Sequence, residues 1–347
     1  MIFFSPYISK PDSVAQIMLK VLLALIPGIA LYVWYFGPAI LVSITLASLT
    51  ALGTEALMLK LRNRPIMPFL KDNSALLTGW LLALSIPPLA PWWMIVVGTA
   101  FSIAIAKHLY GGLGNNLFNP AMVGYAVLII SFPMQMTQWI APHGLGQIEP
   151  GFFDQLKYIF FNVLPDNVTL DAITMATPLD NLKTHLHLDQ PIRQILDMPV
   201  YGQLAGHGSE MVAWGFLFGG LYLLAARIIS WHIPVAYLGI LFIIAGIFHL
   251  LDPGHYATPL FHWFSGAAML GAFFILTDPV SSPTTNKGKL IFAAGAALIT
   301  YLIRVFGGFP DGVAFATLLM NICVPLIVLY TQPKVFGKKD SKKGKQP

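Results

Sequence analysis

The sequence predicts an all-α membrane protein of about ten transmembrane helices, arranged as an inverted 5+5 repeat with a large periplasmic loop. Of the 347 residues, 56% are hydrophobic and only 10% are charged, which is the composition of a membrane protein. The apolar runs are continuous rather than alternating, which favours helices over the strands of a membrane barrel. Related motifs lie on either side of one long polar segment, which suggests a repeat.

The ten predicted helices are apolar runs separated by polar or proline-rich segments. Their ranges are 15–36, 38–59, 74–88, 91–108, 117–133, 211–230, 233–251, 259–278, 288–305 and 311–331. The third is short for a bilayer and runs into Pro87, Pro88 and Pro91, so we expect it to be tilted or partly re-entrant. Residues 1–12 lack the features of a cleaved signal peptide, so the first helix is expected to serve as the insertion signal.

Basic residues predict the orientation, because loops rich in lysine and arginine stay in the cytoplasm. The loop after the second helix is basic and is assigned to that side. Alternation through ten helices then leaves both termini in the cytoplasm and residues 134–210 in the periplasm, with Arg304 as the one basic exception near the outer face. The loop includes an amphipathic stretch at 151–164, which either lies on the membrane surface or packs on the bundle.

The predicted organisation has four parts. Residues 1–133 form a first transmembrane half of five helices, 134–210 the periplasmic loop, 211–331 a second half of five helices, and 332–347 a basic cytoplasmic tail. The lysines of this tail account for much of the net charge of +5, so the charge does not point to nucleic acid.

Two pairs of segments support the inverted repeat. Residues 75–87 align without gaps on 267–279, and 111–116 align on 307–312. With five helices on each side of the loop, corresponding helices point in opposite directions, as in many transporters and channels. The alternative is chance similarity, because glycine and proline are frequent in membrane helices.

Several chemistries are excluded by motifs that the sequence lacks. The single cysteine, Cys323, permits neither an internal disulfide nor a cysteine-ligated iron–sulfur or zinc site. No Walker motif and no dinucleotide-binding glycine motif is present, so neither ATP hydrolysis nor NADH binding is expected. His185 and His187 lack nearby ligands at metal spacing and are interpreted as solvated histidines. We predict no metal site and no independent catalytic residue.

Three acids are candidates for an ion path, since acidic residues within or beside membrane helices are often functional. These are Glu55, Asp278 and Asp311. The alternatives are structural: Asp278 precedes a proline and suits a turn, and Glu55 could extend to the nearby cytoplasmic surface or pair with Lys60.

A cluster of amides precedes the fifth helix. Asn115, Asn116 and Asn119 stand before or beside Pro120. They could hydrogen-bond the edge of a flavin ring, or Asn119 could cap the helix that Pro120 begins; the two roles are compatible.

The 134–210 segment contains the sequence Asp-Ala-Ile-Thr-Met-Ala-Thr, which ends at Thr177. By itself, a threonine before a proline is typical of a turn. The motif of Asp171, Thr174, Ala176 and Thr177 resembles the acceptor at which a flavin transferase esterifies the phosphate of FMN onto a threonine. This resemblance implies that Thr177 is the attachment residue; Met175 stands where the motif usually has glycine.

The whole chain resembles the D-subunit family of the Rnf/Rsx ion-translocating electron transport complex, which is related to the B subunit of the sodium-pumping NADH:quinone reductase. The motifs that carry the resemblance lie at 72–79, 114–121, 174–180, 276–279 and 307–316.

The resemblance implies a multi-pass subunit of a bacterial inner-membrane complex. This subunit would carry covalent FMN and couple electron transfer, between ferredoxin- and NADH-type partners, to the movement of Na⁺ or H⁺. Sister subunits would carry the iron–sulfur clusters, and relatives also hold non-covalent riboflavin. One alternative is a solute transporter or channel without a redox role, which has no need of the acceptor motif; a structural membrane anchor is another.

Overall fold

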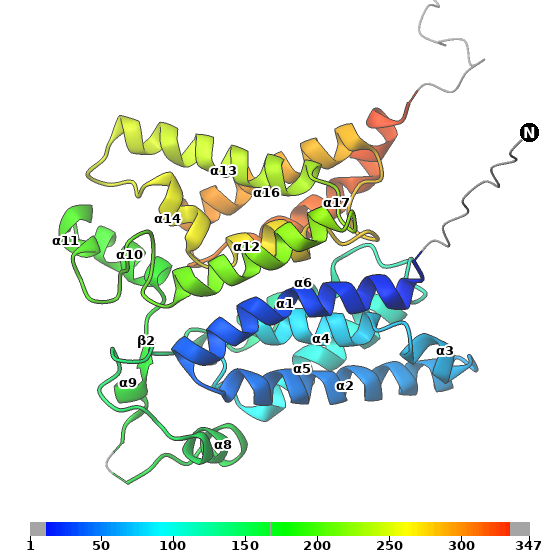
Figure 1. Cartoon of the computed structure of the whole chain (residues 1–347), viewed down its shortest axis with the longest axis horizontal. Helices are drawn as coiled ribbons and strands as arrows, with labels where there is room; N and C mark the ends of the chain where they lie inside the picture. The colour runs from blue at the N-terminus through cyan, green and yellow to red at the C-terminus, as the bar shows by residue number, and fades with distance from the viewer. Residues whose placement is uncertain (1–11, 167, 334–347) are drawn as a thin grey trace, which may run out of the picture.

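The computed structural model describes residues 12–166 and 168–333, and the fold is helical apart from one short ribbon. The prediction that the first twelve residues lack a cleaved signal peptide falls, for residues 1–11, outside these described residues, as does the prediction for the lysines from Lys334 onward. Figure 1 shows a bundle of lengthwise helices in two layers, one from each half of the chain. The 134–210 segment lies at one end of the bundle, and both ends of the described chain lie at the other.

The helices of the first half follow the apolar runs of the sequence. They are α1 (Val14–Phe36), α2 (Ala39–Leu61), the short α3 (Ile66–Leu70), α4 (Ser74–Ser85), α5 (Trp92–Phe101) continued by the π-helix η1 (Ser102–His108), and α6 (Pro120–Ser131). Ser13 and Gln16 form a capping box that begins α1, and Gly37, at φ 84°, ends it.

The second half contains a broken helix at a position where the sequence predicts a continuous one. Its elements are α12 (Ser209–Ala225), α13 (His232–Leu251), α14 (Pro259–Phe264), α15 (Ala268–Leu270), the π-helix η2 (Gly271–Ile275), α16 (Asn286–Phe306) and α17 (Val313–Thr331). The prediction of a continuous helix over 259–278 is wrong, because the chain is interrupted between α14 and α15. Gly266 allows the interruption, since its φ of +59° is a conformation that glycine adopts without strain.

The 134–210 segment is a chain of short elements. They are α7 (Pro133–Met136), β1 (Trp139–Ile140), α8 (Phe152–Phe161), α9 (Leu170–Ile173), β2 (Thr174–Met175), α10 (Pro178–His187) and α11 (Ile192–Leu196). The strands pair antiparallel, with Trp139 opposite Met175 and Ile140 opposite Thr174. This ribbon is the one departure from the all-α prediction within the described residues.

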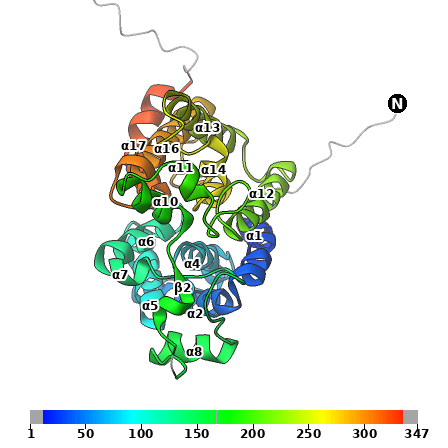
Figure 2. The same cartoon turned by 90° about the vertical axis from the view of Figure 1, so that its left-hand side faces the viewer.

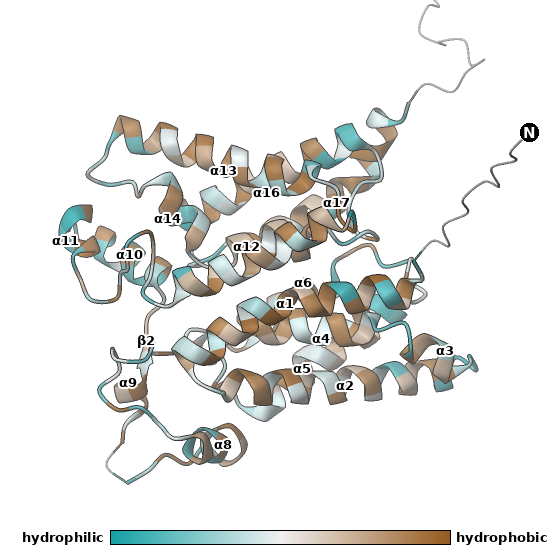
Figure 3. Cartoon of the chain, viewed as in Figure 1, coloured by the Kyte–Doolittle hydropathy of each residue, from teal (hydrophilic) through white to brown (hydrophobic). Residues whose placement is uncertain are grey.

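Among the described residues, five helices are long and apolar enough to cross a membrane: α1, α2, α13, α16 and α17. Four further apolar helices are shorter: α4, α5 with η1, α6 and α12. In Figure 3 hydrophobic residues cover the bundle helices, and hydrophilic residues gather at the ends of the bundle. All ten predicted runs are therefore helical, at least in part, but ten crossings and the inverted repeat remain predictions.

Two helix pairs join the halves: α1 packs along α12, and α6 packs against α17. The first pair approaches closely through glycine. A Cβ atom on Gly215 would lie 2.7 Å from the Cα of Gly28, and one on Gly219 would overlap the carbonyl oxygen of Ala24. In lipid, such small residues allow backbones to pack tightly. Each joining pair combines predicted helices at the same position in the two halves, the first with the sixth and the fifth with the tenth.

Candidate functional site

The segment before Thr177 is held in place by the ribbon and by a short helix. β2 contains Thr174 and pairs with β1, and the Thr174 hydroxyl donates a 2.9 Å hydrogen bond to the carbonyl of Leu170 in α9. Asp171 and Ala176 are exposed. Of the two motif threonines, Thr174 therefore uses its hydroxyl within its own turn.

Thr177 is the N-cap of α10. Its backbone is extended (φ −62°, ψ 154°), as expected for a residue before proline, and Pro178 occupies the first helical position. The Oγ1 atom accepts a 3.2 Å hydrogen bond from the backbone N–H of Asp180. The hydroxyl thus lies at the positive end of a ten-residue helix, where negative charge is stabilised.

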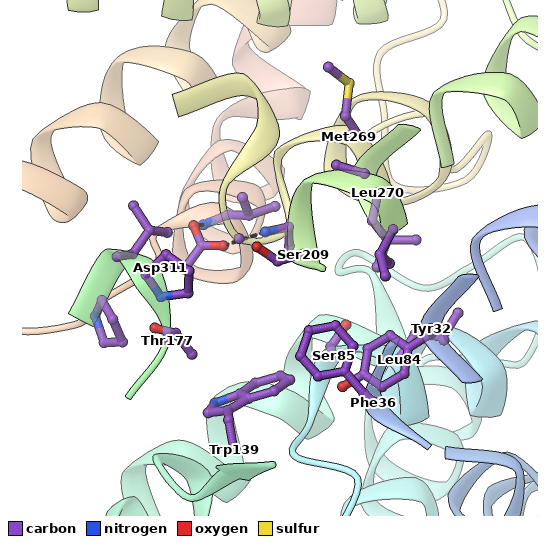
Figure 4. Close-up of a pocket in the computed structure, with 18 of the residues that line it drawn as sticks. Tyr32, Phe36, Leu84, Ser85, Trp139, Thr177, Ser209, Met269, Leu270 and Asp311 are labelled. Carbon is purple, nitrogen blue, oxygen red and sulfur yellow. Dashed lines mark hydrogen bonds between the residues drawn. The ribbon is translucent and has the colours of Figure 1, made fainter. Parts of the chain in front are cut away.

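Thr177 also lies on the wall of a cavity of about 180 Å³ between the two halves. Figure 4 shows the side chains around this space, with Tyr32, Phe36 and Leu84 of the first half opposite Met269 and Leu270 of the second. Residues of α6 and α12 complete the wall. The cavity is therefore lined largely by apolar and aromatic side chains.

Trp139 lines the same cavity and comes from β1, the strand opposite the acceptor segment. Figure 4 shows its indole ring between Thr177 and Phe36. The sequence did not predict a role for Trp139, because it precedes Thr177 by 38 residues and no sequence motif connects the two. The ribbon register alone brings the two segments together.

The charged group at this cavity is Asp311, one of the predicted ion-path residues. Its carboxylate accepts hydrogen bonds from the backbone N–H of Ala267 (2.7 Å) and from Arg304 Nε (3.0 Å). Arg304 in turn donates to the carbonyls of His262 and Ser265. The pair thus holds the interrupted helix against the α16–α17 connection, and the guanidinium of Arg304 is buried rather than facing the surface.

Lys183 fastens α10 to the second half. Its amine donates to the carbonyls of Phe309 (2.9 Å), Ile303 (3.3 Å) and Gly307 at the end of α16. Cations are favoured at such a helix C-terminus. Burial lowers the pKa of Lys183, and burial raises the pKa of the nearby Asp180, although attraction between the two charges opposes each change.

A second cavity, of about 190 Å³, lies between the halves near the start of α1, toward the end of the bundle where the described chain begins. Asn116, Asn119 and Asp278 line it. Asn116 Oδ1 is buried and has no hydrogen-bond partner among the described residues. Asn115 is exposed and does not line this cavity.

Asn119 has both a capping and a joining role. Its Oδ1 accepts from the N–H groups of Ala121 and Met122 at the start of α6. Its Nδ2 donates to the carbonyl of Ile275, and its own N–H donates to Asn321 of α17. The capping interpretation is therefore confirmed, and the same side chain connects the halves.

Glu55 is buried in an ion pair. Lys107 Nζ lies 3.0 and 2.9 Å from its two carboxylate oxygens, and His108 Nε2 lies 3.1 Å away. The structural alternatives for Glu55, extension to the surface or a pair with Lys60, are wrong, because η1 brings Lys107, which is distant in sequence, next to it. The position of Lys107 at the end of an apolar run is the sequence signal for such a buried partner.

Asp278 makes a turn. Its carboxylate accepts from the N–H groups of Val280 and Ser281 and from the Ser281 hydroxyl. Asp278 and Lys107 line the same cavity, whereas Asp311 lines the other. The structure thus places Asp278 and Asp311 at two separate cavities, while Glu55 lines neither of them and contacts Lys107 of the second.

His185 and His187 lie on helix α10. His185 Nδ1 is 2.8 Å from Gln190 Oε1. In the part of the chain that the structure describes, no group of three or more metal-ligating side chains comes together.

Comparison with known proteins gives a family match over almost the whole chain. The model of the NQR2, RnfD, RnfE family matches residues 1–337. The D subunit of the ion-translocating oxidoreductase complex of Escherichia fergusonii is 54% identical over 343 residues, which cover 96% of this chain and 97% of that protein. The proteins of the same name from Klebsiella pneumoniae and Cronobacter sakazakii are 54% and 52% identical over 343 residues; 96% of this chain and 98% of each protein are covered.

Proposed function

The chain belongs to the NQR2, RnfD, RnfE family, and from this we propose that it is a membrane subunit of an ion-translocating oxidoreductase complex that carries FMN covalently on Thr177. The observation that carries the flavin proposal is the position of Thr177, whose hydroxyl caps a helix at the wall of an apolar cavity. In this role the chain transfers electrons, and the assembled complex moves Na⁺ or H⁺.

The helix N-terminus fits a phosphate ester. A phosphate on Thr177 Oγ1 would lie beside the backbone N–H of Asp180 in the first turn of α10 and at the positive end of the helix dipole. Pro178 holds the backbone in the geometry that begins the helix. The chain therefore stabilises the negative charge of the ester without a dedicated basic pocket.

The cavity fits a flat aromatic ring. Trp139, Phe36 and Tyr32 offer aromatic surface, and the apolar residues around them exclude water. When bound, FMN accepts and donates one or two electrons, and the protein supplies its position and electrostatic environment. Arg304 neutralises Asp311, so the ring would not face an uncompensated carboxylate.

The second cavity supports non-covalent riboflavin as a further cofactor. The unpartnered Asn116 Oδ1 is an acceptor that suits an N–H group of a neutral flavin ring, and Asn119 lies nearby in the same lining. We assign Asn116 and Asn119 to such contacts. Asn115, being exposed, is the weakest of the three candidates for a flavin contact.

The remaining assignments follow from the proposed role. We assign the chain to the bacterial inner membrane, with cytoplasmic termini and the 134–210 segment in the periplasm, where a flavin transferase would modify Thr177. Ferredoxin- and NADH-type electron carriers would act through sister subunits. The alternative of a solute transporter without a redox role shares the two cavities at the joint but gives no reason for the acceptor motif.

The test is the intact mass of the chain purified after co-expression with a flavin transferase, with peptide mapping and in-gel flavin fluorescence. We expect a mass increase equal to FMN less one water, mapped to Thr177. Thr177→Asn removes the hydroxyl but keeps a good helix cap, so it should fold and remain unmodified. Thr174→Ser is the matched control: it keeps a hydroxyl at the other motif threonine and should retain the flavin.

An unmodified Thr177 under these conditions would leave the motif as a turn and favour the transporter. Modification mapped instead to Thr174 would overturn the assignment of the acceptor residue.

A further inference from the structure

Helix α8 lies crosswise to the bundle. In Figure 1 the bundle helices run lengthwise and α8 is viewed nearly along its axis, beside the end of α2; in Figure 2, turned by a quarter, α8 is viewed from the side below α2. It is therefore transverse to the helices that are long enough to cross a membrane and lies at the rim of the bundle.

The inner face of α8 supports the acceptor ribbon. Tyr158 and Ile159 are buried in a small core with Ile140 of β1 and Ile173, the residue before β2. Ala39 of α2 belongs to the same core. The position of α8 along the long axis of the bundle thus fixes the position of the ribbon that leads to Thr177.

The outer face of α8 is aromatic and uncovered. Phe153 and Phe161 are 75% and 76% exposed, and Phe160 is also exposed. Lys157 is the charged residue among them and is exposed as well. A helix in water does not normally present three phenylalanines on its free face, whereas a helix in the plane of a membrane interface does, with basic side chains reaching toward lipid phosphates.

A groove continues this face toward the bundle. It has a volume of about 500 Å³ and is lined by Trp92 and Trp93 at the start of α5, by Met134, and by Phe160 and Phe161. The amides of Gln135, Gln138 and Asn162 lie along it. Tryptophan rings beside polar amides are typical of the level at which the hydrocarbon meets the headgroups.

From these contacts we propose that α8 is an in-plane membrane anchor, whose outer face and adjoining groove bind phospholipid of the bilayer leaflet at this end of the bundle. The occupant is lipid because the groove joins the exposed Phe160 and Phe161 of α8 to the exposed Trp92, which begins the apolar helix α5, and to the exposed Met134, which follows the apolar helix α6. The anchor holds the ribbon, and with it Thr177, at the level of the membrane surface.

The test uses the full chain in lipid nanodiscs, alone and in the assembled complex, with spin labels on single cysteines. In a Cys323→Ser background, Phe153→Cys and Phe161→Cys report on the outer face of α8. Leu49→Cys, exposed midway along α2, is the lipid control, and Gln194→Cys, exposed on α11, is the water control. Both α8 positions are exposed, so the substitutions remove no buried contact.

We expect the ratio of oxygen to nickel-chelate accessibility at both α8 positions to be several-fold higher than at Gln194 and to approach that at Leu49. A ratio equal to that at Gln194 would mean that α8 lies in water and would overturn the proposal. Labels protected from both reagents in the complex would mean that a protein partner covers the face, which would also overturn it. The result does not depend on whether Thr177 carries flavin.

Discussion

Thr177 and Thr174 differ in what surrounds their hydroxyls. Thr174 donates to a carbonyl within its own turn, whereas Thr177 accepts from the first turn of a helix and lies at a cavity. A phosphate ester at Thr177 would place several acceptor oxygens at the helix N-terminus instead of one. It would therefore strengthen the capping interaction that the Thr177 hydroxyl already makes. The same ester at Thr174 would remove the hydroxyl proton, and with it the hydrogen bond that Thr174 donates to the carbonyl of Leu170.

Asp180, three residues after the acceptor, gives a pH-dependent prediction. Burial raises its pKa above the ordinary value of about 3.9, and Lys183 offsets this only in part. A raised pKa in the folded state means that the folded protein binds this proton more tightly than the unfolded chain does. The stability from this residue is therefore full below the ordinary pKa and is lost as the pH rises through the folded-state pKa.

Asp180→Asn should raise the melting temperature at neutral pH, and the gain should disappear below about pH 4, where the native carboxyl is already protonated. Thermal unfolding of the flavin-free chain in detergent between pH 3.5 and 8 measures this. Asp197→Asn, at an exposed position, is the control and should show a much smaller effect. A loss of stability at neutral pH would show that attraction of the Asp180 carboxylate to the helix dipole outweighs the cost of its burial.

At the scale of elements, residues near a helix start predict where the helix begins, but the sequence of an apolar run does not predict whether the helix is continuous. Asn119 with Pro120, and Thr177 with Pro178, begin helices as their types predict. The break between α14 and α15 has no equally clear signal, because Ser265 and Gly266 occur in an apolar run that suits a continuous helix. The break is stabilised from outside, by Arg304 and Asp311 bonding the freed backbone groups.

The α1–α12 contact gives the prediction at this scale. Gly219→Ala should destabilise the protein by about 1–3 kcal/mol, because the new methyl group would overlap the Ala24 carbonyl and push the two backbones apart. Gly239→Ala on α13 is the matched control: nothing lies within 4 Å of its added methyl group, and alanine favours the helix. Thermal unfolding in detergent compares the two. Equal stability of both variants would mean that the joint between α1 and α12 tolerates a wider separation.

At the scale of the whole molecule, the two halves meet around two cavities, one near each end of α1. Tyr32, near the end of α1, lines the first, and Met18, near its start, lines the second. Close contacts between the halves, through Gly28 and Gly215, lie between the two cavities along the same helix pair. Two cofactor sites on the joint would therefore be separated by packed helix, which limits free diffusion between them.

The Glu55–Lys107 pair gives the prediction for the molecule in its complex. If this buried pair takes part in ion movement, Glu55→Gln should lower the number of ions moved per electron in reconstituted vesicles, while electron flow continues. The variant also leaves Lys107 uncompensated, which costs about 3–5 kcal/mol for a buried pair. Glu55→Gln combined with Lys107→Met restores the charge balance and should recover assembly without recovering coupling.

The control for this experiment is Asp252→Asn, an exposed acid that lines neither cavity and should leave the ratio of ions to electrons unchanged. An unchanged ratio in Glu55→Gln, at normal electron flow, would assign the ion path to another subunit.

The sequence by itself determined the helical runs, the long polar segment between them, and the place in that segment of the motif that ends at Thr177. These features depend on apolar composition, on capping residues and on a contiguous motif, all of which act over a few neighbouring residues. Only the tertiary structure decided that Trp139 faces Thr177, that Lys107 neutralises Glu55, and that Asp311 joins Arg304 at the broken helix. Each of these pairings depends on how helices and strands distant in sequence pack against one another, and no local pattern encodes that packing.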